Sequence, residues 1–291
     1  MENTTIITLN WNRVADTLAF LETARQQTLP DIHVIVVDNG STDGSVERIN
    51  AQFPEVELLG HPNNLGFARG MNRGIRQALA EGAAYLFIAN NDTLLAPDLL
   101  QRLVSQAQQN HASIIAPVIF YASQPDLIWS AGAEGNPLNL EIIDSWRGKP
   151  RSNLSSAPYP VDFVTACGML VSKACFDEVG LFDERFFMYY EDSDFSLRVK
   201  RAGGQILIDP QAQMWHKVAA SSGGSDSASE RYWMARSSLI YFRKHARFSQ
   251  WLVIGPYRLG SAIKTSFRLL ARGKTSALGA YWRGLIDGLK I

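Results

Sequence analysis

The stretch that decides the fold reads Tyr85-Leu86-Phe87-Ile88-Ala89-Asn90-Asn91-Asp92-Thr93. Its first five residues are an unbroken apolar run, which is typical of a buried central strand, and the run ends in two amides and a carboxylate. In an open α/β sheet, ligands bind where the carboxyl ends of the strands meet the loops. Asp92 is therefore a candidate ligand-binding carboxylate, although an Asp shortly before Pro97 is equally typical of a turn or a helix cap.

Strand and helix patterns alternate before this stretch and continue after it. Strands are predicted at 4–9, 33–37, 56–59, 85–89 and 113–119. Four helices are predicted between them. Two are indicated by apolar residues at helical spacing, one by Val14, Leu18 and Leu21 and one by Ile75 and Leu79, and the other two are predicted at 46–53 and 97–109. This alternation indicates an α/β fold with a mostly parallel, doubly wound sheet flanked by helices.

The pattern loosens after the fifth strand. Residues 121–160 mix Pro, Gly, Ser and Asn with aromatic residues such as Trp129 and Trp146, which predicts strands and loops that cover a site. An apolar segment at 163–171, a helix at 193–202 and two final strands at 205–208 and 212–215 follow. Residues 221–229 are rich in Ser, Gly and Asp and predict a mobile loop.

Composition and charge divide the chain into an acidic body and a basic tail. The 291 residues are 46% hydrophobic and 19% charged, as in an ordinary globular protein, and the formal net charge is zero. Residues 231–291 hold 12 Lys and Arg against one Asp, so residues 1–230 carry the acidic excess and nucleic acid is not an expected partner. With two cysteines, Cys167 and Cys175, the chain has no disulfide framework, and reduced core thiols are expected.

The tail from Tyr232 onward has helical periodicity, with Leu252, Ile263 and Phe267 spaced among basic residues. Two interpretations remain open: helices that pack on the body and on a second subunit of a homodimer, or a basic amphipathic surface that lies on anionic lipid. Residues 1–12 have no secretory signal pattern, and the longest apolar run of the tail, 251–254, is too short to span a bilayer. A cytoplasmic protein is expected, with membrane contact only at the surface.

Two more strand ends carry polar residues toward the edge where Asp92 lies. Asn10 ends the first strand, and Asp38 ends the second in a turn of Asn, Gly and Ser. A carboxylate there can accept the imide N–H of uracil or thymine, or a ribose hydroxyl, and a capped turn explains it equally well. Gly66 and Gly70 open a helix as phosphate-binding loops do, without the Gly-x-Gly-x-x-Gly spacing or the lysine of a P-loop.

A cluster of carboxylates begins the helix predicted after residue 190. Aromatic residues run into Glu191, Asp192 and Asp194. The helix dipole favours acidic groups in a first turn, but clustered and desolvated carboxylates also bind protons more tightly, which is how a general base is tuned. Asp194 is expected to pair with Arg198 at i+4, which leaves Glu191 or Asp192 for chemistry.

His216 ends the last predicted strand. A single His there is more often a satisfied hydrogen-bonding residue than a metal ligand. If His216 faces Asp92 across a crevice, the two residues offer a metal ion one imidazole nitrogen and one carboxylate oxygen. Substrate phosphates and water would complete such a shell for Mg²⁺ or Mn²⁺.

Taken in order, these segments resemble the family 2 inverting glycosyltransferases with the GT-A fold, over about residues 4–245. The resemblance is carried by Val36-Val37-Asp38-Asn39-Gly40-Ser41-Thr42-Asp43, Asn64-Leu65-Gly66-Phe67-Ala68-Arg69-Gly70-Met71-Asn72, Asn90-Asn91-Asp92, Glu191-Asp192-Ser193-Asp194 and Trp215-His216-Lys217. Asn90 stands where the family has the first Asp of its Asp-x-Asp metal motif.

The resemblance implies roles for these residues. Asp192 would be the general base, with Glu191 helping to stabilise positive charge on the sugar, and Asp92 and His216 would hold Mg²⁺ or Mn²⁺. The residues expected to bind the nucleotide sugar are Asn10, Asp38, Asn39, Gly66, Arg69, Asn72, Asn90, Asn91 and Asp92. Residues 1–230 would form the catalytic domain, with a nucleotide-binding half at 1–110 and an acceptor-binding half at 111–230. Residues 231–291 would be a basic helical C-terminal extension, and the loop at 221–229 would close over the donor.

Within the family, the motifs look most like bacterial rhamnosyltransferases of surface polysaccharide synthesis, which implies dTDP-L-rhamnose as donor and a glycan or lipid-linked acceptor. Two alternatives stay open: a UDP-sugar-dependent transferase, and a catalytically weak nucleotide-sugar-binding protein of the same fold, which Asn90 favours. A sugar nucleotidyltransferase is disfavoured, because no Gly-rich basic loop follows the first strand.

Overall fold

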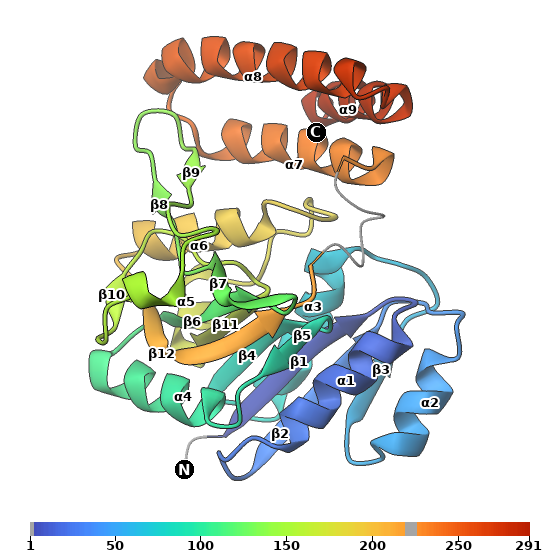
Figure 1. Cartoon of the computed structure of the whole chain (residues 1–291), viewed down its shortest axis with the longest axis vertical. Helices are drawn as coiled ribbons and strands as arrows, with labels where there is room; N and C mark the ends of the chain where they lie inside the picture. The colour runs from blue at the N-terminus through green and yellow to red at the C-terminus, as the bar shows by residue number, and fades with distance from the viewer. Residues whose placement is uncertain (1–2, 219–225) are drawn as a thin grey trace.

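The computed structural model describes residues 3–218 and 226–291, in which a ten-stranded sheet lies between two layers of helices (Figure 1). The strands of the N-terminal half are β1 (Thr4–Asn10), β2 (Ile32–Asp38), β3 (Glu57–Gly60) and β4 (Tyr85–Asn90). They pair in parallel in the order β4-β1-β2-β3, with Asn10 opposite Asp38 and Leu9 opposite Asn90. This register brings the polar strand ends to the same edge of the sheet.

The strands of the C-terminal half make the sheet mixed. They are β5 (Thr93–Leu95), β6 (Ile114–Tyr121), β7 (Gln124–Ser130), β10 (Tyr159–Pro160), β11 (Gly168–Ser172) and β12 (Ile206–His216), while β8 (Glu134–Gly135) and β9 (Ile142–Ile143) form a separate pair. Strand β11 lies antiparallel between β4 and β6, so the mostly parallel sheet that was predicted has an antiparallel strand at its centre.

The two strands predicted at 205–208 and 212–215 form one strand, β12, so that prediction was wrong. The register of β12 against β6 shifts between Asp209 and Gln213. Pro210 has no N–H to donate, and Asp209 Oδ1 accepts the N–H of Gln211 at 2.9 Å. The chain therefore bulges locally and stays in the sheet.

Six helices flank the sheet. They are α1 (Val14–Arg25), α2 (Ser45–Gln52), α3 (Phe67–Ala80), α4 (Leu99–Asn110), α5 (Lys173–Val179) and α6 (Glu191–Arg201). Successive strand residues point to opposite faces, so Ile6 belongs to the core under α1, α2 and α4, and Ile7 to the core under α3, α5 and α6. Packing on both faces of the sheet therefore fixes the position of the edge at which the polar strand ends lie.

The segment 121–160 contains β7 to β10 and the short 3₁₀ helix η1 (Arg151–Asn153), as the predicted mixture of strands and loops implies. Of the loop predicted at 221–229, residues 221–225 lie outside the described residues. Ser227 caps the next helix by accepting the N–H of Glu230 at 3.1 Å, so Ala228 and Ser229 are already helical.

Three helices form the C-terminal extension: α7 (Ala228–His245), α8 (Trp251–Ala271), which follows the 3₁₀ helix η2 (Phe248–Gln250), and α9 (Thr275–Leu289). Helix α7 lies over the body, and α8 and α9 lie beyond it at the end of the molecule away from the sheet (Figure 1). Among the described residues, no helix is both long and apolar enough to cross a membrane.

Candidate active site

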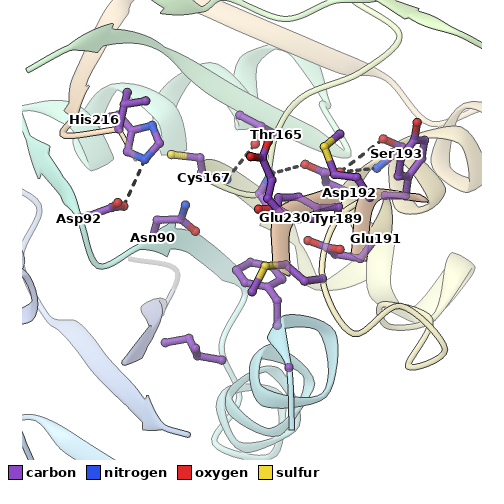
Figure 2. Close-up of a pocket in the computed structure, with 18 of the residues that line it drawn as sticks. Asn90, Asp92, Thr165, Cys167, Tyr189, Glu191, Asp192, Ser193, His216 and Glu230 are labelled. Atoms are coloured by element: carbon purple, nitrogen blue, oxygen red, sulfur yellow. Dashed lines mark hydrogen bonds and ion pairs between the residues drawn. The ribbon is translucent and has the colours of Figure 1, made fainter. Parts of the chain in front are cut away.

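A cavity of about 700 Å³ lies at the carboxyl ends of β1 and β4, against the starts of α6 and α7. Eight of the residues predicted for the site line it: Asn39, Gly66, Asn90, Asn91, Asp92, Glu191, Asp192 and His216. These residues come from five separate segments of the chain. The fold thus brings Asp92, the Glu191–Asp192 pair and His216 to one cavity (Figure 2).

The loop before α3 is shaped by a glycine and an asparagine. Asn39 Nδ2 donates to Asn64 Oδ1 at 2.9 Å and to the carbonyl of Gly66 at 3.1 Å. Gly66 has a positive φ of 82°, and a Cβ there would collide with the carbonyl oxygen of Phe187. The N–H of Phe67 donates to that same oxygen at 2.6 Å, so the loop is fitted against the segment that leads into α6.

Asn10 and Asp38 lie behind the cavity wall and do not line it. Asp38 is buried; its Oδ2 accepts from Asn10 Nδ2 at 2.7 Å, and its Oδ1 accepts from the N–H of Ser41 at 2.9 Å. Thr17 Oγ1 donates to Asn10 Oδ1 at 2.7 Å and accepts from Asn91 Nδ2 at 2.8 Å. These bonds hold three strand ends in register, and direct contact of Asp38 with a base stays a prediction.

Arg69 and Asn72 also lie outside the cavity lining. Asn72 is buried and exchanges two hydrogen bonds with the backbone of Phe182, at 2.9 and 3.1 Å. Arg69 Nε lies 3.5 Å from Glu184 Oε2. Both residues tie α3 to the loop after α5, and their predicted contact with the nucleotide sugar stays a prediction.

Asp92 and His216 face each other at one end of the cavity. His216 pairs with Thr93 in the β5–β12 ladder, and the N–H of Lys217 donates to the carbonyl of Asp92 at 2.9 Å, so backbone contacts fix the pair. Asp92 Oδ1 lies 3.2 Å from His216 Nε2, and both side chains are buried. The ring of Trp129 packs edge-on against His216, with the ring centroids 4.4 Å apart.

This pair suits a divalent cation. Asp92 Oδ1 is buried and makes no hydrogen bond to the described residues, and it faces His216 Nε2, so a carboxylate oxygen and an imidazole nitrogen point toward one position. The one group of three His, Cys, Asp or Glu side chains that is close enough to hold a metal among the described residues is elsewhere, at His33, Glu57 and Glu81. Phosphate oxygens, water or the Asn90 amide would therefore complete the shell around Asp92 and His216.

Asp192 is presented to the cavity by a strained backbone. Tyr189 and Tyr190, just before α6, have positive φ values of 67° and 69°, a conformation that costs free energy for non-glycine residues. The N–H of Ser193 donates to Asp192 Oδ1 at 2.8 Å, and the N–H of Ala166 donates to Oδ2 at 3.4 Å. Burial raises the pKa of Asp192 above its ordinary value, although these donors favour the ionised form.

Glu191 has a different environment. Burial, together with the charge of the neighbouring Asp192, raises the pKa of Glu191 well above its ordinary value. Its Oε2 is buried, with no hydrogen-bond partner among the described residues. Of the two carboxyl groups, Glu191 therefore binds its proton more tightly, and Asp192, with two N–H donors, ionises more readily. The predicted role of Glu191 in stabilising positive charge on the sugar stays a prediction.

Cys167 lies between the two ends of the cavity, with Asp92 and His216 on one side and Asp192 on the other (Figure 2). Burial and the charges of Asp92 and Asp192 raise the pKa of the Cys167 thiol well above its ordinary value. A protonated thiol is a poor nucleophile and a poor metal ligand. Cys167 therefore acts as a small apolar wall residue.

Sequence reasoning assigned no role to several residues that line the cavity: Trp11, Arg13, Trp129, Arg147, Thr165, Glu230 and Met234. Arg147 stacks over Trp129, with its guanidinium carbon 5.0 Å from the ring centroid. Glu230 and Met234 come from α7, so the C-terminal extension forms part of the cavity wall. For Trp129, the only indication in the sequence was that isolated aromatic residues occur in the irregular segment 121–160.

Comparison with known proteins places the chain in a family. A model of glycosyl transferase family 2 matches residues 5–180, which excludes Asp192 and His216. The N-acetylglucosaminyl-diphospho-decaprenol L-rhamnosyltransferase of Mycobacterium tuberculosis is 30% identical over 254 residues, covering 80% of each chain. The dTDP-rhamnosyl transferase RfbF of Shigella flexneri is 26% identical over 220 residues, covering 73% of this chain and 71% of RfbF.

The structure resembles GalNAc-T7, which was solved with UDP, GalNAc and Mn²⁺. The TM-score is 0.65 at 15% identity, and the likeness covers 82% of this chain and 48% of GalNAc-T7. At that identity the likeness shows the fold alone, which is the GT-A fold predicted from the sequence motifs. Because the family model matches more than half of the chain and the relatives are covered along most of their length, the chain belongs to glycosyl transferase family 2.

Proposed function

We propose that this glycosyltransferase moves a rhamnosyl group from dTDP-L-rhamnose to a hydroxyl of a glycan or lipid-linked acceptor in cell-surface polysaccharide synthesis. The names of the two relatives support the donor and the acceptor class. The observation that carries the chemistry is a buried carboxylate, Asp192, that shares one cavity with the Asp92–His216 pair. A proton acceptor and a site for the leaving diphosphate are thus present together.

Asp192 is the proposed general base. Its carboxylate takes the proton of the acceptor hydroxyl as that oxygen attacks the anomeric carbon from the face opposite the diphosphate, so the configuration inverts. Burial and the charge of Asp192 raise the pKa of Glu191, so of the pair Asp192 is the carboxylate that ionises more readily. Cys167, held as a thiol, does not compete as a nucleophile, which agrees with direct displacement.

Asp92 and His216 are the residues that would hold Mg²⁺ or Mn²⁺. When bound, the ion neutralises the negative charge that develops on the leaving diphosphate. Asp92 and His216 orient that end of the donor, and the edge of the Trp129 ring shields His216. GalNAc-T7 was solved with Mn²⁺, which supports a divalent ion in this chain as well.

The remaining wall residues divide between donor and acceptor. Asn39, Gly66 and Asn90 belong to the nucleotide-binding half proposed at 1–110; Asn39 and Gly66 shape the cavity wall, and Asn90 offers its side-chain amide to the donor. The acceptor-binding half proposed at 111–230 supplies Trp129 and Thr165, and its last residue, Glu230, lies in the first turn of α7. Through α7, the C-terminal extension also shapes the acceptor side.

The experiment is transfer by the purified chain with dTDP-L-rhamnose or UDP-sugars as donors, with and without Mg²⁺ or Mn²⁺. Released nucleoside diphosphate and the configuration of the new glycosidic bond by NMR are the readouts. We expect release of dTDP and an inverted linkage. Release of nucleotide from UDP-sugars alone would show that the donor is a UDP-sugar and not dTDP-L-rhamnose. A retained configuration would overturn the role of Asp192. Binding without release would favour the nucleotide-sugar-binding alternative that Asn90 suggests.

A further inference from the structure

Helix α8 has one buried side and one exposed apolar side. Ile254 is buried in a cluster that includes Phe186 of the body, whereas Ala262 and Leu269 are buried among residues of α7 and α9. The apolar residues on the other side are exposed, including Leu252 at 81% and Phe267 at 70%. At 100° per residue, they gather on one side of the helix: Leu252, Leu259, Ile263, Phe267 and Leu270.

Helix α9 extends this exposed side. Trp282, Ile286 and Leu289 are exposed apolar residues on one face of α9. Trp282 Nε1 donates to Ser266 Oγ of α8 at 3.2 Å, so the two helices lie against each other. We name these eight side chains the apolar platform, which lies at the end of the molecule away from the sheet (Figure 1). Folded monomers rarely expose so large a contiguous apolar area, so a partner is expected to cover it.

The charge around the apolar platform is mainly basic. Helix α8 contains no acidic residue, and exposed basic residues flank the platform: Lys264, Arg268, Arg272, Arg283 and Lys290. Arg268 and Arg272 also pair with the buried Asp226, at 3.2 and 2.9 Å, which leaves Lys264 and Arg283 as the rim residues for which no acidic partner is described. The acidic residue of α9, Asp287, already accepts from Tyr232 Oη at 3.1 Å and from Lys290 Nζ at 3.0 Å. A second copy of this chain would bring two basic rims together, whereas an anionic surface complements them.

We propose that the apolar platform docks this protein onto an anionic lipid bilayer, with α8 lying in the plane of the membrane surface. A helix of 21 residues is roughly 30 Å long, so its apolar side can lie along the headgroup boundary. The basic rim then meets the phosphates of anionic lipids. Since no described helix can cross a membrane, the attachment is peripheral.

The inner side of α8 connects the apolar platform to the cavity. Arg258 Nη2 donates to Ser238 Oγ of α7 at 2.7 Å, and Arg258 Nη1 lies 3.6 Å from Glu141 Oε1. Glu141 lines the cavity. A consequence that rests on the proposed function is that docking holds the cavity beside the membrane from which a lipid-linked acceptor projects.

The test is flotation of the full chain with vesicles of phosphatidylcholine alone or mixed with phosphatidylglycerol, at two salt concentrations. We expect the chain to float with the mixed vesicles, less so at high salt, and weakly with the neutral ones. The double variant I263S/F267S should lose at least tenfold in binding. Lys264→Gln should lose about fivefold, because each basic residue near the surface contributes to anionic lipid binding. The matched control Lys173→Gln, on α5 in the body, should bind as the parent does.

Two further measurements keep the outcomes distinct. Thermal stabilisation by dTDP shows that each variant is folded, and it needs no lipid. Sedimentation velocity without lipid gives the oligomeric state. Binding to neither vesicle type, or equal binding by I263S/F267S and the parent, overturns the proposal. If the parent binds no vesicles and forms a stable dimer that I263S/F267S does not form, the apolar platform is a subunit interface. Failure of transfer alone would count only against the proposed function.

Discussion

At the residue scale, the two adjacent acidic residues at the start of α6 have different environments. Burial and the charge of Asp192 raise the pKa of Glu191, whose Oε2 has no partner among the described residues, whereas Asp192 accepts two backbone N–H groups. The sequence suggested chemistry at this pair but could not divide it, because burial and hydrogen bonding depend on the loop at 165–167. Trp129 and Arg147 could not be predicted as neighbours, since the irregular segment that carries them has no periodicity to align.

The pH dependence of transfer follows from this division. Asp192 must be ionised to accept a proton, and burial raises its pKa above the ordinary value. Activity should therefore fall as the pH decreases through that raised pKa and be constant above it until another group titrates. The measurement is kcat/KM against pH with dTDP-L-rhamnose. A profile that is flat down to about pH 4, the ordinary value for Asp, would argue against Asp192 as the base.

Replacing Glu191 by Gln should be tolerated. The variant Glu191→Gln keeps a neutral group of similar shape, as the raised pKa of Glu191 implies. We expect kcat to fall less than about tenfold, whereas loss of a general base costs about 10²- to 10⁴-fold. Single-turnover rates of the variant and the parent are the measurement, with the circular dichroism spectrum as the folding control. A loss in the upper range would mean that Glu191 acts as an ionised group.

At the element scale, most strands and helices were predictable from alternating apolar runs and helical spacing. The antiparallel β11 and the bulge in β12 were not, because strand direction and bulges depend on pairing between distant segments. The packing of α7 on α9 also depends on contacts between segments that are distant in the sequence. Gly284 of α9 lies so close to the backbone of Tyr232 that a Cβ would collide with its carbonyl oxygen, and periodicity gives no sign of this contact.

Two glycine substitutions in α9 should have opposite effects. Gly284→Ala would push α9 away from α7, because its Cβ would meet the Tyr232 carbonyl oxygen and Ala235 Cβ. We expect a destabilisation of about 1–3 kcal/mol. Gly279→Ala is the matched control, since no heavy atom of the described residues lies within 4 Å of its Cβ, and it should stabilise by up to about 1 kcal/mol. Urea unfolding measures both, and equal effects would contradict this packing.

A buried ion cluster joins α6 to α7. Asp194 Oδ2 accepts from Arg198 Nε at 2.9 Å, as predicted, and Asp194 Oδ1 lies 2.6 Å from Lys244 Nζ and 2.7 Å from His245 Nε2. Burial opposes ionisation of Asp194, but the bonds from His245 and Lys244 outweigh it, so the pKa lies below its ordinary value. Arg201 Nη1 lies 2.9 Å from His245 Nδ1, which makes Nδ1 the acceptor and Nε2–H the donor to Asp194.

The variant Asp194→Asn should therefore be less stable than the parent, by about 3 kcal/mol at neutral pH, because it removes the buried carboxylate charge that Arg198 and Lys244 both face. With a depressed folded-state pKa, the contribution of Asp194 is complete above the unfolded pKa of about 3.9 and is lost as the pH falls toward the folded value. The difference in thermal midpoint between parent and variant should shrink from pH 7 to pH 3. A difference that is constant over this range would show that the charge of Asp194 is not what stabilises the junction.

At the scale of the whole molecule, the fold gathers groups from distant parts of the chain into one cavity, and these groups are expected to act together on the donor. The GT-A fold and the position of the cavity followed from the strand ends and the family motifs. The part of the cavity wall formed by α7 could not be predicted, because helical periodicity in a tail does not indicate the surface on which the helix packs. Glu230 and Met234 are thus products of the tertiary structure.

In the proposed mechanism Asp192 accepts the proton, and a separate corner of the cavity, Asp92 with His216, holds the donor's diphosphate. Comparing Asp192→Asn with the parent in two assays, calorimetric binding of dTDP with Mn²⁺ and the rate of rhamnosyl transfer, tests this division most directly. We expect the variant to bind dTDP within about threefold of the parent while transfer falls at least about 100-fold. Transfer at the parent's rate, or a parallel loss of binding and transfer, would contradict it.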